Sequence, residues 1–300
     1  MKFVSLFDGI SCGKVAAQKA GLSVDSYYAY EINPNAIKIS QKNHPDIIQC
    51  GDVTKEDFTK HKDVDFVIGG SPCQNMSSLG DRKGLSGEKS KLFYEYARAI
   101  KEITPKYFLL ENNANMPKAD KAEITKILNV EPIEINSKLF VPQNRNRLYW
   151  IGKREKDGTY KKVDISIKNV RTKDLKDIIS DEHKPIKLVK TVENALPKII
   201  EKYGYLPEMF NPYNLAEITT IAPCLTTQNS QTMSNTVIIK KDDNYIMLNA
   251  LDWERLQGLP DNYTAGFSEN IRKSAIGNGW TIDVIAHIFS EIMKMECDEK

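Results

Sequence analysis

Short apolar runs alternate with amphipathic stretches along the first half of the chain, and this alternation restricts the fold more than any other feature. The sequence predicts strands at residues 3–6, 26–31, 65–68 and 107–111, and helices at 14–20, after Pro34 and at 91–103. Strand–helix–strand units of this kind form a mostly parallel sheet with helices on both faces. We therefore expect an α/β fold that binds its ligands at the carboxyl ends of the strands.

The length and composition allow one large domain with a smaller one beside it. The chain has 300 residues, of which 41% are hydrophobic and 27% charged, as in an ordinary globular protein. No apolar run reaches the length that spans a bilayer. The first residues do not form a signal peptide, because Asp8 interrupts their short apolar stretch. We expect a cytoplasmic protein without a membrane partner.

The cysteines favour free thiols over structural cross-links. There are five of them, and no two are spaced as Cys-x-x-Cys. An odd number without paired spacing argues against a disulfide framework and against a cysteine-based zinc site. We therefore expect no bound metal and a thiol that is available for chemistry.

The second half of the chain changes in character near Lys153. Between Lys153 and Lys202 there are 14 Lys and Arg against 9 Asp and Glu, although the whole chain carries a net charge of only +2. A phosphate-facing module and a solvated lysine-rich surface both explain this excess. Periodicity is weak up to about Tyr245 and returns in helical runs at residues 250–257 and 281–295. We expect a main domain of residues 1–153 and 246–300, and a smaller irregular domain of residues 154–245.

The turn after the first strand and the acids after the next two are candidates for binding a nucleoside-like ligand. Gly9 and Gly13 allow a tight turn before a helix, whose first N–H groups attract negative or polar ligand atoms. Glu31 ends the second strand, where a carboxylate accepts from ribose hydroxyls. Asp52 follows a presumed short strand that lies between those of residues 26–31 and 65–68, and it could accept from an adenine amino group. An ordinary strand-to-helix turn explains the glycines equally well.

A cysteine and a glutamate end two further strands of the predicted sheet. Cys73 follows Pro72 in a glycine-rich turn, which would hold its thiol rigid and exposed, although buried thiols are the commoner case. Glu111 ends the apolar strand of residues 107–111. Its carboxylate suits a ligand with an amidine-like edge, which presents one N–H donor and one protonated ring nitrogen. The alternative is that Glu111 is a solvated residue at the end of a strand.

Taken together, six fragments in this order resemble the DNA (cytosine-5)-methyltransferase family over most of the chain. They are Asp8-Gly9-Ile10-Ser11-Cys12-Gly13, Ser71-Pro72-Cys73-Gln74, Glu111-Asn112, Gln143-Asn144-Arg145-Asn146-Arg147, Glu254-Arg255-Leu256-Gln257-Gly258-Leu259-Pro260 and Gly277-Asn278-Gly279-Trp280. Residues 91–95 and 261–264 are most similar to the animal de novo DNA methyltransferases and their bacterial relatives. The sequence departs from the family pattern at Asn113, Trp280 and the Ser11-Cys12 pair.

The resemblance implies a Rossmann-like, S-adenosylmethionine-dependent methyltransferase domain that releases S-adenosyl-L-homocysteine. It implies Cys73 as the nucleophile, Glu111 as the group that binds the cytosine edge, and Arg147 together with Arg145 as ligands of the base oxygen. The implied cofactor-binding residues are Phe7, Asp8, Gly9, Ile10, Gly13, Glu31, Ile32, Asp52, Val53, Pro72, Leu92 and Asn278. The base that removes the C5 proton is not identified.

The resemblance also implies that duplex DNA is the substrate and that the target cytosine flips out of the helix. Residues 154–245 become the target-recognition domain, and a cognate restriction endonuclease is a further candidate partner. Candidate base readers are Arg171, Gln228, Asn229 and Gln231, and residues 74–90 are a candidate loop that closes over the base.

Three other functions remain open. An amino-group methyltransferase shares the fold, but it needs a Pro-Pro-aromatic segment where Ser71-Pro72-Cys73 stands. A transfer RNA methyltransferase of the same family would use the same chemistry on a different substrate. A catalytically silent DNA-binding homologue would have no reason to keep Cys73, Glu111, Arg145 and Arg147 together.

Overall fold

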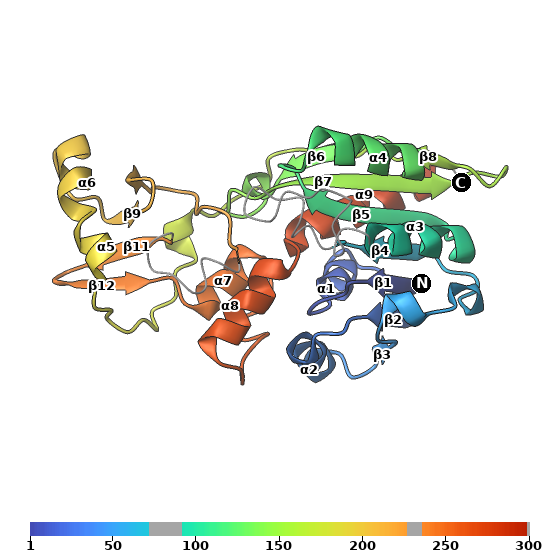
Figure 1. Cartoon of the computed structure of the whole chain (residues 1–300), viewed down its shortest axis with the longest axis horizontal. Coiled ribbons are helices and arrows are strands. Elements are labelled where there is room, and N and C mark those ends of the chain that lie inside the picture. Colours follow the sequence, from blue (N-terminus) through green and yellow to red (C-terminus); the bar gives the residue numbers. More distant parts are fainter. Residues whose placement is uncertain (72–91, 227–235, 299–300) are drawn as a thin grey trace. The chain divides into compact units, whose positions relative to one another are not determined.

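The computed structural model of this chain describes residues 1–71, 92–226 and 236–298 (Figure 1). The predicted residues Pro72, Cys73, Gln228, Asn229 and Gln231, and the predicted loop of residues 74–90, lie outside the described residues. The chain divides into two compact units. The first contains residues 1–136, 146–167 and 284–300, and the second contains residues 137–145 and 168–283.

The first unit is built on an eight-stranded sheet. Its strands are β1 (Lys2–Leu6), β2 (Ser26–Tyr30), β3 (Ile48–Gln49), β4 (Phe66–Gly69), β5 (Tyr107–Asn113), β6 (Ile133–Asn136), β7 (Asn146–Arg154) and β8 (Tyr160–Lys162). Their order is β3-β2-β1-β4-β5-β7-β6, with β8 paired to β7. The first five strands in this order are parallel, whereas β7 runs antiparallel to its neighbours β5 and β6.

Helices flank the sheet of this unit, and the first three of them connect parallel strands. They are α1 (Cys12–Lys19), α2 (Pro34–Asn43), α3 (Leu92–Ile103), α4 (Lys118–Leu128) and α9 (Ile282–Asp298), with short 3-10 turns at Val53–Lys55 and Phe58–Lys60. The chain first moves outward from β1 to β2 and β3, and then returns to place β4 on the other side of β1. This reversal makes the carboxyl ends of β1 and β4 the expected ligand-binding edge.

Alternating side chains explain why helices cover both faces of the sheet. Val4, Val67 and Phe108 pack in one core with residues of α3 and α4. Their neighbours Phe3 and Phe66 point to the opposite face, where their rings contact Phe289 of α9 at centroid distances of 5.8 and 5.3 Å. The predicted α/β fold with a mostly parallel sheet is therefore confirmed.

The second unit contains more regular structure than the sequence indicated. It has a four-stranded antiparallel sheet in the order β10-β9-β11-β12. Its elements are the 3-10 turns Ser137–Leu139 and Leu175–Asp177, the helices α5 (Lys190–Glu193), α6 (Leu196–Tyr203), α7 (Ala250–Leu256) and α8 (Glu269–Asn278), and the strands β9 (Met209–Asn211), β10 (Ala216–Glu217), β11 (Ile238–Lys241) and β12 (Asn244–Met247). Strands of two to four residues are too short for a visible alternation of polar and apolar residues, which is why the sequence predicts an irregular domain at residues 154–245.

None of the helices within residues 1–71, 92–226 and 236–298 is long and apolar enough to cross a membrane.

The packing of α9 makes a prediction about stability. Phe289 is fully buried against Phe3 and Phe66, so Phe289→Ala leaves a cavity and should lower the free energy of unfolding by about 3–5 kcal/mol. Urea denaturation measures this loss. Ile127→Ala on α4 is the control, because Ile127 is 41% exposed. A loss at Phe289 no larger than that at Ile127 would contradict the observed packing.

Candidate active site

The turn after β1 is held in an unusual backbone conformation. Phe7, Gly9 and Ser11 have φ values of 58°, 61° and 61°, in the left-handed region. Only glycine adopts this region without strain, and an ideal Cβ on Gly9 would meet no atom within 4 Å. Ser11 precedes α1 and makes no side-chain capping bond to its first turn, which contains Gly13. The turn therefore leaves open space beside Gly9 and an uncapped helix N-terminus after it.

Glu31 ties this turn to the end of β2. Its Oε2 accepts a hydrogen bond from the Gly9 N–H at 2.8 Å, and its Oε1 accepts from the N–H groups of Ile32 and Asn33 at 2.8 and 2.7 Å. A carboxylate offers about four acceptor positions, so these three bonds leave little capacity for a ligand hydroxyl. Glu31 thus has a structural part in shaping the turn, which the sequence pattern does not indicate.

Asp8 lies in the same turn and has an altered acidity. The hydroxyl groups of Tyr27 and Ser11 donate hydrogen bonds to its two oxygens. Burial nevertheless raises the pKa of Asp8 from 3.8 to about 6, with a smaller contribution from the negative charge of Glu31. The carboxyl group is therefore partly protonated in weakly acidic solution.

The remaining predicted cofactor residues of the first unit differ in exposure. Asp52 accepts from the main-chain N–H and the hydroxyl of Thr54 through Oδ1, and these bonds lower its pKa. Ile32 is 73% exposed, whereas Val53 is buried in the core that contains α3. Ile10 is buried in the turn, and Leu92 is the first residue of α3.

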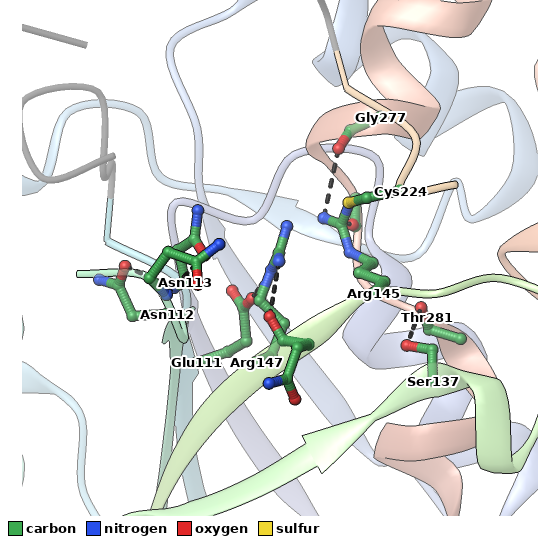
Figure 2. Close-up of polar contacts among 12 residues, drawn as sticks. Glu111, Asn112, Asn113, Ser137, Arg145, Arg147, Cys224, Gly277 and Thr281 are labelled. Carbon is green, nitrogen blue, oxygen red and sulfur yellow. Dashed lines mark hydrogen bonds and ion pairs between the residues drawn. The ribbon is translucent and has the colours of Figure 1, made fainter. Parts of the chain in front are cut away.

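Glu111 and Arg147 form an ion pair on adjacent strands of the sheet. The Arg147 Nε lies 2.9 Å from the Glu111 Oε1, and the two side chains are only 13% and 12% exposed (Figure 2). Arg147 also donates from Nη1 to the Asn146 carbonyl. Tyr149 of β7 lies directly opposite Glu111, so Arg147 is its diagonal neighbour on the same face. The structure thus brings together two of the four predicted catalytic residues.

Asn112 connects this strand end to the residue that precedes the predicted nucleophile segment. Its Nδ2 lies 3.2 Å from the Ser71 hydroxyl and 3.4 Å from the Ser71 carbonyl oxygen, and the side chain is buried. Gly69 of β4 pairs with Leu110 of β5, so the chain leaves β4 beside Glu111. Asn112 belongs to the Glu111-Asn112 fragment, but the sequence pattern indicates no role for it.

Arg145 has different surroundings from Arg147. It belongs to the second unit, whereas Arg147 belongs to the first. Its guanidinium donates to the Gly277 carbonyl oxygen at 3.3 Å (Figure 2). It also donates to the carbonyl oxygens of Leu225 and Gly279, at 2.9 and 3.0 Å, and the side chain is 5% exposed. These contacts are to main chain within the same unit.

Two further predicted residues, Asn278 and Arg171, lie in the second unit. Asn278 is exposed at the last position of α8. Arg171 donates from Nη1 to the Asp174 carboxylate at 2.5 Å and to the Lys173 carbonyl. Its role as a base reader remains a prediction.

The altered acidity of Asp8 makes a prediction about pH. Unfolding returns this carboxyl to its ordinary pKa of 3.8, so between pH 4 and 6 the folded protein holds more of the proton. The contribution of Asp8 to stability is therefore lost as the pH rises through this range. Asp8→Asn cannot ionise, so its free energy of unfolding should rise relative to wild type from pH 4 to 7. A difference between the two proteins that does not change with pH would contradict the raised pKa.

Comparisons with known proteins identify the family of this chain. The sequence profile of the C-5 cytosine-specific DNA methylase family matches residues 1–294. The orphan methyltransferase M.SPRI of Bacillus phage SPR is 35% identical over 167 residues, covering 52% of this chain and 38% of that protein. The type II methyltransferase M1.ScrFI of Lactococcus lactis subsp. cremoris is 29% identical over 315 residues, covering 98% of this chain and 78% of that protein.

The chain spans only 33% to 46% of the length of four phage and Neisseria methyltransferases that it matches. Among solved structures, the Entamoeba histolytica methyltransferase EhMeth shares the fold with a TM-score of 0.75 and 16% identity, covering 99% of this chain and 98% of that one. The resemblance inferred from the sequence is confirmed, because the family profile covers nearly the whole sequence. This chain belongs to the C-5 cytosine-specific DNA methylase family.

Proposed function

We propose that this chain transfers a methyl group to C5 of a cytosine in duplex DNA, with Cys73 as a covalent nucleophile. The observation that carries the proposal is the Glu111–Arg147 ion pair at the carboxyl end of β5. It lies one strand away from the end of β4, which leads through Ser71 to Cys73. In the sequence, Cys73 follows Ser71 by two residues.

The residues around the β1 turn fit S-adenosylmethionine as the methyl donor. The space beside Gly9 and the uncapped start of α1 suit close approach of polar ligand atoms. Asp52 uses Oδ1 for Thr54, while its Oδ2 has only a distant contact with Lys55 at 3.9 Å among the described residues. That oxygen can accept from an adenine amino group, and the exposed Ile32 can cover an adenine ring. When bound, S-adenosylmethionine supplies the electrophilic methyl group that C5 takes up.

Covalent addition would solve the central chemical problem, which is that C5 of cytosine is a poor nucleophile. The Cys73 thiolate adds to C6, and the electron pair of the C5–C6 bond becomes available at C5. After methylation a base removes the C5 proton, the C6–S bond breaks and the thiolate leaves. The thiol has an ordinary pKa of about 8.5, so its surroundings must favour the ionised form.

Glu111 and Arg147 would make C6 more electrophilic. The Glu111 carboxylate accepts from the exocyclic amino group and favours protonation of N3, while Arg147 donates to O2 and stabilises negative charge on the ring. Their ion pair orients both side chains before the base arrives. Because the target atoms are inaccessible inside a duplex, the cytosine must flip out. We assign residues 154–245 to target recognition, on their position and the positive charge of residues 153–202.

Trapping of the covalent intermediate tests the whole proposal. Duplex DNA with 5-fluorocytosine at the target, mixed with protein and S-adenosylmethionine, should give an adduct that survives denaturation, because fluorine cannot leave as a cation. The adduct should appear as a slower band on a denaturing gel and be absent with Cys73→Ser. An adduct with substituted transfer RNA but not with DNA would instead support the transfer RNA methyltransferase alternative. No adduct with either nucleic acid, given confirmed target sequences, would refute the covalent mechanism.

Replacing Glu111 tests the base-binding role. Glu111→Gln keeps the shape but removes the charge that favours N3 protonation, so the methylation rate should fall by about 100-fold or more. DNA affinity, measured by fluorescence anisotropy, should stay close to that of wild type. Glu134→Gln on neighbouring β6 is a suitable control, because Glu134 is exposed and bonds only to Asn146 among the described residues. A rate loss of less than about tenfold for Glu111→Gln would exclude this role.

A further inference from the structure

We propose that Arg145 is a positioning residue that couples the cofactor-binding turn at Gly277–Gly279 to the recognition segment at Ala222–Leu225, and that it does not touch the target base. The inference rests on the proposed function, because the link between Asn278 and the cofactor is itself a prediction. It changes the role that the sequence resemblance gave to Arg145.

The contacts of the guanidinium are the first argument. Its Nη1 donates to the Leu225 carbonyl at 2.9 Å, and its Nη2 donates to the carbonyls of Gly279 and Gly277 at 3.0 and 3.3 Å. The Cys224 sulfur lies 3.6 Å from Nη1. Both terminal nitrogens are thus used by main-chain groups from two segments that lie more than 50 residues apart in the sequence.

Two buried glutamines reinforce the same links. Gln143 accepts from the Leu225 N–H through Oε1 at 3.2 Å and donates through Nε2 to the Leu256 carbonyl at 2.9 Å. Gln257 donates to the carbonyls of Ile276 and Gly279 at 3.0 and 3.1 Å. Leu225 is therefore held at both its N–H and its carbonyl, and the Gly279 carbonyl is shared by Arg145 and Gln257.

Main-chain contacts complete the connection. Asn144 donates to the Ala222 carbonyl and Ala222 donates to the Pro142 carbonyl, both at 2.8 Å. The Thr281 hydroxyl bonds to the Gln257 side chain at 2.7 Å and to the Ser137 hydroxyl at 2.9 Å. We call Gln143, Arg145, Gln257 and Thr281 the Arg145 cluster. All four are buried and lie in the second unit.

The chemistry of a buried arginine makes this cluster sensitive to substitution. An arginine stays protonated in proteins, and its planar fork can bond several carbonyls at once. Lysine keeps the charge but has a single terminal nitrogen, so it cannot reproduce the separate contacts of Nη1 with Leu225 and of Nη2 with Gly279. Carbonyl groups that lose a charged donor in a buried site are left without compensation. Loosening at either segment should therefore be transmitted to the other.

The contrast with Arg147 explains how one short motif can serve two purposes. Arg147 lies in β7 and pairs with the Glu111 carboxylate. Arg145 precedes β7 and bonds to main-chain carbonyls of the second unit. The two arginines are only two residues apart, yet one is placed to meet a substrate and the other to hold protein segments.

The matched variants Arg145→Lys and Arg147→Lys test the proposal. In Arg145→Lys, hydrogen exchange should accelerate in both peptides that cover residues 222–226 and 276–281. The dissociation constant of S-adenosyl-L-homocysteine, measured by calorimetry without DNA, should rise about tenfold. At saturating cofactor, kcat should stay within about threefold of wild type. Arg147→Lys should show the reverse: unchanged exchange and cofactor affinity, with a large loss of kcat.

The outcomes separate this proposal from the proposed function. Arg145→Lys could keep the cofactor affinity and the exchange protection of both peptides but lose kcat, as Arg147→Lys does. In that case Arg145 acts at the base and the proposal is wrong. If Arg145→Lys does not fold, Gln257→Met removes two donors to the same turn while keeping side-chain volume. Unchanged exchange and affinity in Gln257→Met would then overturn the coupling. Wild-type protein that binds cofactor but methylates no cytosine would refute the proposed function, while the exchange measurements would still decide the role of Arg145.

Discussion

The parallel pairing of β1, β4 and β5 is the constraint on which the site depends. Parallel strands end at the same edge of a sheet, so the β1 turn, the segment after Gly69 and the end of β5 are brought together without any direct bond between them. The register then fixes details: Gly69 pairs with Leu110, which places Glu111 one residue beyond the end of β4. Antiparallel β7 returns along β5 and supplies Arg147 at the diagonal position.

Much of the first unit could be predicted from the sequence, because its signals are local. Apolar runs of four or five residues, Pro34 at the start of α2 and the glycines of the β1 turn mark strands, helices and a tight turn within a few residues of their observed positions. The Glu111–Arg147 contact could not be derived in this way, since it depends on β7 pairing beside β5. Motif resemblance named both residues, but the ion pair between them became visible only in the structure.

The second unit shows the opposite case. Its strands β9 and β10 contain three and two residues, and β9 pairs with β11 across a separation of more than 20 residues. Such short strands carry no periodicity, and their pairing is decided by buried side chains such as Ile199, Phe210 and Ile238. The Arg145 cluster is equally invisible, because its arginine bonds to carbonyl oxygens, which every residue has. A motif match can name Arg145, but it cannot distinguish contact with a substrate from contact with the main chain.

Alternation along β5 explains why the neighbouring residues Glu111 and Asn112 contact two different segments. Successive side chains of a strand point to opposite faces. Glu111 therefore shares a face with Arg147, while Asn112 points to the other face and holds Ser71 at the end of the β4 segment. A shift of one residue in the pairing of β5 with β7 would put Glu111 and Arg147 on opposite faces of the sheet and break their ion pair. The strand that fills the core with Phe108 and Leu110 thus also places the Glu111 carboxylate beside Arg147 and the Asn112 amide beside Ser71.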